Sequence, residues 1–123
     1  MAGETAGGAA GGTRCQVDMG EGGRFSWRLI ASNGRVIALG ANAYLDEATC
    51  REAFEELCAR PGDLTGGVQH AAEANGWVWR LRDAAGAVRA VSARSYERHS
   101  TCQAAYERFR VLLPALGRAP MSP

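Results

Sequence analysis

Hydrophobic and polar residues alternate along the segment that begins at Phe25. Phe25, Trp27 and Leu29 fall on one side of an extended chain, and the residues between them fall on the other. Residues 33–34, Asn-Gly, favour the positive φ angles of a two-residue hairpin turn, and the mainly apolar residues 35–39 follow them. The pattern predicts a β-hairpin whose aromatic side chains share one face.

Downstream of this hairpin the hydrophobic period changes from two residues to about 3.6, which indicates a helix. The apolar stripe recurs at helical spacing and consists of Cys50, Ala53, Phe54, Leu57 and Cys58. Asp46 stands before the stripe, where a carboxylate accepts hydrogen bonds from the free amides of a helix N-terminus. Pro61 and Gly62 end the pattern. We therefore expect a helix between Asp46 and Pro61.

The same hairpin and helix recur 52 residues further along the chain. Residues 77–81, Trp-Val-Trp-Arg-Leu, repeat the Phe-Ser-Trp-Arg-Leu of residues 25–29, and the match continues to residue 109 without a gap. The shift also relates identical residues at turn and helix positions: Gly34 and Gly86, Tyr44 and Tyr96, Thr49 and Thr101, and Cys50 and Cys102. Identities at large and turn-forming residues predict tandem duplication of one supersecondary unit.

The second copy has different turn and capping residues. Its turn is Ala85-Gly86, and Arg98, a poor cap, stands where the first copy has its capping aspartate. Ser100 with Gln103 offers a capping box two residues later. The second helical stripe consists of Cys102, Ala105, Tyr106, Phe109, Leu112 and Leu113.

Residues 15–19 and 67–71 precede the two hairpins at matching places and predict one further strand in each copy. The predicted fold class is therefore α+β: two tandem β-β-β-α units form one antiparallel sheet, with two helices packed on one face. A chain of 123 residues has the common size of a single domain. The predicted boundaries are a disordered Gly/Ala tail at 1–13, a first unit at 14–60, a linker at 61–66, a second unit at 67–116 and a disordered tail at 117–123.

The chain resembles the YegP-like family, small bacterial and archaeal domains of unknown function that often occur in tandem. The resemblance rests on a strand that reads F-x-W-R-L, an N-G turn, V-I-A and a Tyr before an Ala-rich helix. The resemblance covers residues 25–57 and again 77–109. It implies that pairs of β-β-β-α units, in one chain or two, form one antiparallel sheet with the helices on one face. It implies no catalytic residues. This chain has Ala-Asn-Ala-Tyr at 41–44, where a Gly-Glu-Gly-Tyr-like segment is common in the family.

Net charge gives little indication of a partner. The chain has 14 basic and 13 acidic side chains, a balance of +1, so bulk charge does not favour nucleic acid or an anionic membrane. Every basic residue is arginine, which is typical of a GC-rich genome and makes each arginine a weaker functional signal. The chain has no apolar stretch of signal or membrane-span length, and its four cysteines show no CxxC spacing. We expect a cytoplasmic protein with free thiols.

Arginines on the uncovered face of the sheet are the candidate binding residues. Alternation sends the aromatic residues toward the helices and sends Arg28, Arg80, Arg82 and Arg89 to the opposite face, beside Ile30, Val78 and Val91. This face predicts a non-enzymatic interaction module that binds an unknown protein or an anionic partner, with monomer as the expected state. Because the tryptophans are assigned to the core, nucleic acid is not favoured, although aromatic and basic sheets do stack single-stranded bases.

The competing function is a thiol-based redox sensor or enzyme that uses Cys50 and Cys102. Both cysteines lie near the N-terminus of a predicted helix, where the helix dipole and unpaired amides can lower a thiol pKa. Both also lie on apolar stripes, where cysteine acts as a small hydrophobic residue. His99 could share a helix face with Cys102, but no further ligand has metal-binding spacing. Tyr44 and Tyr96 could border a ligand, although packing is the commoner role of such residues. We expect no catalytic residue, no cofactor and no metal.

Overall fold

The structure is a computed structural model that describes residues 12–118. The strands are β1 (Arg14–Met19), β2 (Phe25–Ile30), β3 (Val36–Gly40), β4 (Thr65–Ala71), β5 (Gly76–Arg82) and β6 (Val88–Ser92), and the helices are α1 (Glu47–Ala59) and α2 (His99–Arg118). Three short 3-10 turns, η3 (Glu21–Gly23), η4 (Pro61–Asp63) and η5 (Ala72–Ala74), connect some of them. The predicted tails lie outside the described residues at 1–11 and 119–123. Thr13 is buried, and α2 extends to Arg118.

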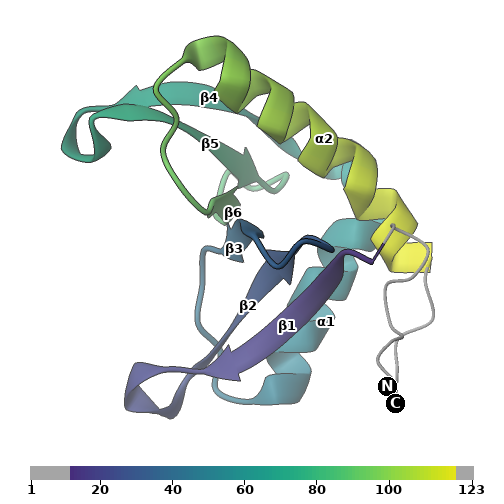
Figure 1. Ribbon diagram of the computed structural model, residues 1–123. Coiled ribbons are helices and arrows are strands. Elements are labelled where there is room, and N and C mark those ends of the chain that lie inside the picture. The colour runs from purple at the N-terminus through teal and green to yellow at the C-terminus, as the bar shows by residue number, and fades with distance from the viewer. Residues whose placement is uncertain (1–11, 119–123) are drawn as a thin grey trace.

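All six strands form one antiparallel sheet in the order β1-β2-β3-β6-β5-β4. α1 packs on β1 and β2, α2 packs on β4 and β5, and the two helices touch each other on the same side of the sheet (Figure 1). The α+β class with one antiparallel sheet and two helices is confirmed. At the centre β3 pairs with β6 through Ala38–Ser92, Leu39–Val91 and Gly40–Ala90.

The two hairpin turns differ from the predicted type. Gly34 N donates to Ala31 O and Gly86 N donates to Asp83 O, so each loop has three residues rather than two. Of the turn residues only the glycines have positive φ, +88° in both cases. A type I turn followed by a left-handed glycine needs no positive φ at the preceding residue. Ala85 can therefore replace the asparagine of the first turn.

The two helices also begin differently. Asp46 caps α1 as predicted, since its Oδ1 accepts a hydrogen bond of 2.7 Å from Thr49 N. The capping box predicted for Ser100 and Gln103 is wrong. α2 already begins at His99, so Ser100 lies inside the first turn, and the Gln103 side chain donates to Glu107 instead.

The predicted linker at 61–66 is shorter in the structure, because β4 starts at Thr65. Gly66 is a strand residue whose lack of a side chain is required: a Cβ there would collide with the Arg80 carbonyl and approach Tyr106 Oη to 2.8 Å. Arg110 fixes η4 to α2 by donating to the Pro61 carbonyl at 3.1 Å and to Tyr106 Oη at 2.8 Å.

The constant shift of 52 residues does not extend to the outer strands. Met19 pairs with Phe25 in the first half, and His70 pairs with Trp77 in the second, so the turn between the strands is one residue longer in the second half. The outer strands therefore match at a shift of 51. Gln16 corresponds to Gly67, and both stand opposite an arginine.

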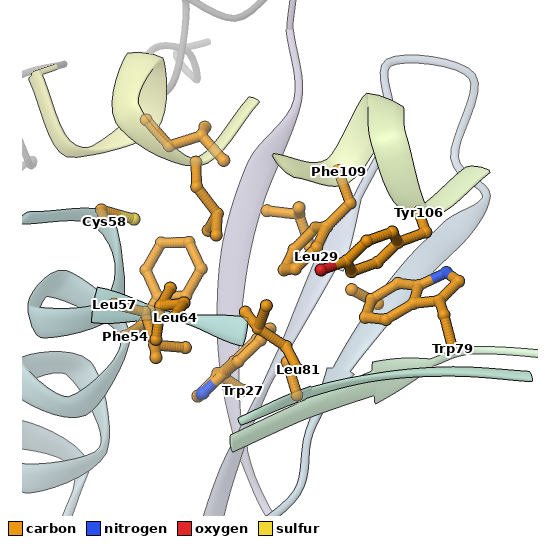
Figure 2. Close-up of a cluster of buried hydrophobic side chains, with 14 of the residues drawn as sticks. Trp27, Leu29, Phe54, Leu57, Cys58, Leu64, Trp79, Leu81, Tyr106 and Phe109 are labelled. Atoms are coloured by element: carbon orange, nitrogen blue, oxygen red, sulfur yellow. The ribbon is translucent and has the colours of Figure 1, made fainter. Parts of the chain in front are cut away.

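The core lies between the sheet and the helices and contains both central tryptophans (Figure 2). Trp27 is 2% exposed and meets Phe54 edge-on, with ring centroids 4.9 Å apart and planes at 62°. Trp79 is fully buried and stacks on Phe109 at 4.6 Å and 23°. The predicted inward direction of the aromatic residues is confirmed for both.

The residue behind each tryptophan explains the different ring orientations. A Cβ at Gly40 would lie 2.7 Å from Trp27 Nε1, so the Trp27 indole occupies space that only glycine leaves free. The corresponding residue of the second half, opposite Ala38 in β6, is Ser92. Because Ser92 has a Cβ, Trp79 cannot lie as Trp27 does.

Replacement of either tryptophan by alanine should destabilise the protein strongly. Trp27→Ala and Trp79→Ala each remove a large buried ring, and we expect a loss of about 3–5 kcal/mol in the free energy of unfolding. Urea denaturation followed by circular dichroism measures it. An unchanged midpoint for either variant would contradict the assignment of these rings to the core.

Gly40→Ala should also destabilise the fold, by about 1–3 kcal/mol, because the new methyl group overpacks the buried Trp27 indole. The matched control is Gly67→Ala in β4, where a Cβ would meet no atom within 4 Å. The two variants are compared by thermal unfolding. Equal melting temperatures would show that Trp27 adapts without loss.

Candidate interaction surface on the uncovered sheet face

A single row of cross-strand neighbours runs over the uncovered face of the sheet, from one edge to the other. Pairing places each member opposite the next, and the row consists of Gln16, Arg28, Leu39, Val91, Arg80 and Gly67. We call it the transverse row. Its centre is apolar, and Leu39 is 36% exposed. Arg28 and Arg80 flank that centre at three strand spacings, about 14 Å between Cα atoms.

Arg28 already has a carboxylate partner in its own chain. Arg28 Nε lies 3.0 Å from Asp18 Oδ2, and Gln16 Nε2 donates to Asp18 Oδ1 at 2.9 Å. Both charged side chains remain more than 40% exposed, so the pair adds little to stability. It does orient the guanidinium toward β1 and neutralise it.

Arg80 and Arg82 lie on the same face, because they alternate along β5 with the buried Trp79 and Leu81. None of the ion pairs among residues 12–118 includes either arginine. Among the described residues, the Arg82 guanidinium has one hydrogen-bond partner, the Gly86 carbonyl at 3.2 Å. The second half therefore presents two guanidinium groups without a carboxylate partner in the described part of the chain.

A shallow cavity of about 230 Å³ adjoins the Arg80 end of the transverse row. It is lined by Val78, Arg80 and Val91 of the sheet and by the η5 turn that follows β4. Glu73 of that turn shares the lining but lies beyond ion-pair distance from Arg80. An apolar floor beside an unpaired guanidinium suits an acidic side chain that carries methylene groups.

The structure places Arg89 away from the other three arginines. Leu81 pairs with Ala90 and Arg82 pairs with Val88, so β6 has one extra residue at Arg89, and this bulge breaks the alternation used to assign Arg89 to the uncovered face. Its guanidinium instead pairs with Asp83 at 3.2 Å, and its side chain is only 19% exposed. Together with Glu56 and Leu57 of α1 it lines a separate cavity of about 220 Å³.

Asp83 has several hydrogen-bond partners in this second cavity. Its Oδ1 accepts from the backbone amides of Ala87 and Ala85, each at 3.0 Å. The Ala87 bond, with the smaller contribution of Arg89, holds the pKa of the Asp83 carboxyl below its ordinary value. Arg89 therefore serves the hairpin turn, and the arginines on the uncovered face are Arg28, Arg80 and Arg82.

The cysteines of the alternative function are both inaccessible. Cys50 and Cys102 are fully buried, and burial raises the pKa of each thiol above its ordinary value. Cys15 and Cys58, which the sequence did not bring together, lie near each other, and burial raises the pKa of each to about 12. Burial thus opposes the activation expected at a helix N-terminus.

The remaining candidate residues have packing contacts. His99 and His70 both meet the Trp77 ring edge-on, with centroids 4.9 and 5.2 Å away. Within residues 12–118, no three metal-ligating side chains cluster. Tyr44 and Tyr96 bridge to Phe25 and Trp77 through paired backbone hydrogen bonds.

No helix within the described residues has the length and apolar character needed to span a membrane.

Comparison with known proteins identifies the fold. No family model and no curated protein matches the chain. The solution NMR structure of the UPF0339 protein SO3888 from Shewanella oneidensis is similar, with a TM-score of 0.65, 14% identity and coverage of 85% of this chain and 86% of that one. The yegP protein of unknown function from E. coli, also solved by NMR, aligns with a TM-score of 0.62 and 12% identity over 89% and 90% of the two chains. This chain therefore has the fold of the UPF0339 and YegP proteins, as its resemblance to the YegP-like family implied.

Proposed function

We propose that the chain is a cytoplasmic, monomeric, non-enzymatic interaction module that binds an acidic protein partner through the uncovered face of its sheet. The observation that carries the proposal is that Arg80 and Arg82 stand on this face without an ion-pair partner in the described part of the chain. A guanidinium presents a planar set of donors that matches a carboxylate, which makes arginine common at protein interfaces.

The composition of the face supports a protein partner. The transverse row combines an apolar centre, Leu39 and Val91, with cationic flanks, as the core and rim of a protein interface do. Single-stranded nucleic acid binds instead to exposed aromatic rings. Here Trp27 and Trp79 are buried beneath the helices and cannot stack on bases.

We further propose that the module arose by tandem duplication of a β-β-β-α unit. The element order is the same in both halves, and the hairpin turns and the backbone bridges to Tyr44 and Tyr96 recur at equivalent positions. On the uncovered face the halves have diverged. Where the first half has Arg28 and Ile30, which is buried rather than exposed as predicted, the second has Arg80 and the exposed Arg82, so we assign partner binding chiefly to the second half.

The competing thiol function predicts rapid modification of Cys50 and Cys102. Because both thiols are buried and have raised pKa values, we expect slow labelling by a thiol reagent in the native protein at neutral pH and fast labelling after unfolding in urea. Mass spectrometry after timed quenching locates the labelled residues. Labelling of both cysteines in the native protein at the rate of the unfolded chain would favour the redox function instead.

Replacement of the two unpaired arginines should weaken binding to an acidic partner. The double variant Arg80→Gln, Arg82→Ile should bind a glutamate-rich peptide up to about tenfold more weakly at low salt, and the difference should shrink as salt screens the charges. Arg108→Gln on the exposed side of α2 is the matched control and should bind like the wild type. Fluorescence titration measures the affinities.

Single-stranded DNA is titrated in parallel with the peptide. Absence of binding to either probe would leave the arginines as merely solvated residues and refute the proposed function. Tight binding of DNA alone would reassign the face to nucleic acid.

A further inference from the structure

β4 is an unprotected edge of the sheet. It is a terminal strand whose seven residue pairs with β5 run without a bulge, and no strand of the described chain covers its outer side. It contains neither proline nor a charged residue, the usual features that keep an edge strand from pairing with another chain. Its free backbone groups can therefore accept an added extended segment.

At the opposite edge of the sheet, β1 has a carboxylate that β4 lacks at the equivalent place. In β1, Gln16 stands opposite Arg28, and Asp18 lies two residues beyond Gln16. The Asp18 carboxylate forms an ion pair with Arg28 at 3.0 Å. In β4 the residue two beyond Gly67, the partner of Arg80, is Gln69. Arg28 is thus neutralised by its own chain, whereas the equivalent place beside Arg80 holds an uncharged amide.

Gly67 leaves the path from the β4 edge to Arg80 open. A Cβ at Gly67 would meet no atom within 4 Å. Strands in a sheet are spaced by about 4.8 Å, so a strand added to β4 would place a Cα about 10 Å from the Cα of Arg80. An arginine and a glutamate side chain together span that distance, and Gly67 places no side chain between them.

We propose that an extended acidic segment of a protein partner adds to the outer edge of β4 and supplies to Arg80 the carboxylate that Asp18 supplies to Arg28. Side chains on one face of a strand are two residues apart, so a second acidic residue of the segment lies beside Thr65. Thr65 pairs with Arg82 across the strands, and the second acidic residue therefore reaches Arg82. The backbone of β4 fixes the segment, and the two arginines select its charge. The inference rests on the proposed function and adds the mode of binding.

The test uses the full chain and a peptide of the length of β4 in which glutamate alternates with threonine. Gln69→Asp places a carboxylate where β1 has Asp18, so it should neutralise Arg80 within the chain and weaken peptide binding about fivefold at low salt. Gln69→Asn is the matched control, and because it keeps an uncharged amide it should leave the affinity unchanged. Gly67→Thr fills the open path with a residue that strands accept and should weaken binding similarly.

Peptides methylated on alternate backbone nitrogens separate this inference from the proposed function. A strand added to β4 turns every second amide toward the edge, so one of the two methylation patterns should abolish binding and the other should not. Equal binding of both methylated peptides would overturn strand addition and leave binding by the uncovered face intact. Wild-type affinity in Gln69→Asp and Gly67→Thr, with both variants folded, would also overturn it. No binding of any acidic peptide would refute both proposals.

Discussion

The pairing of β3 with β6 is the interaction on which the rest of this structure depends. Three residue pairs join the two halves of the chain into one sheet and bring α1 and α2 to the same side of it. The helices then bury both central tryptophans from that side, and no element of the described chain covers the other side. The same pairing sets Leu39 beside Val91, so it also creates the centre of the transverse row.

Much of the fold could be predicted from the sequence, because alternation and helical spacing are local signals. The alternation of Phe25, Trp27 and Leu29 predicted the face of β2 that packs on the core, and Asp46 predicted the start of α1. The capping box of the second helix failed because His99 already belongs to α2, and the helix there begins without the residue types that usually mark a start.

The candidate site was less predictable, since it depends on irregularities that alternation does not reveal. The bulge at Arg89 in β6 removed this arginine from the uncovered face, and a one-residue longer turn moved Gly67 opposite Arg80. Neither feature has a clear sequence signal. Asp18, the partner of Arg28, was missed because ion pairs between neighbouring strands follow from register, which requires the structure.

The α1–β4 connection lets the two halves of the sheet surface diverge in sequence independently of each other. In a twofold dimer of identical chains, every substitution occurs on both sides of the axis, so a residue that benefits one side must be tolerated on the other. Here the two sides belong to one polypeptide, joined through η4, which Arg110 holds against α2. Each side is then free to vary alone. One chain encodes the two edges separately, so a difference such as Asp18 in β1 against Gln69 at the equivalent place in β4 can arise and persist.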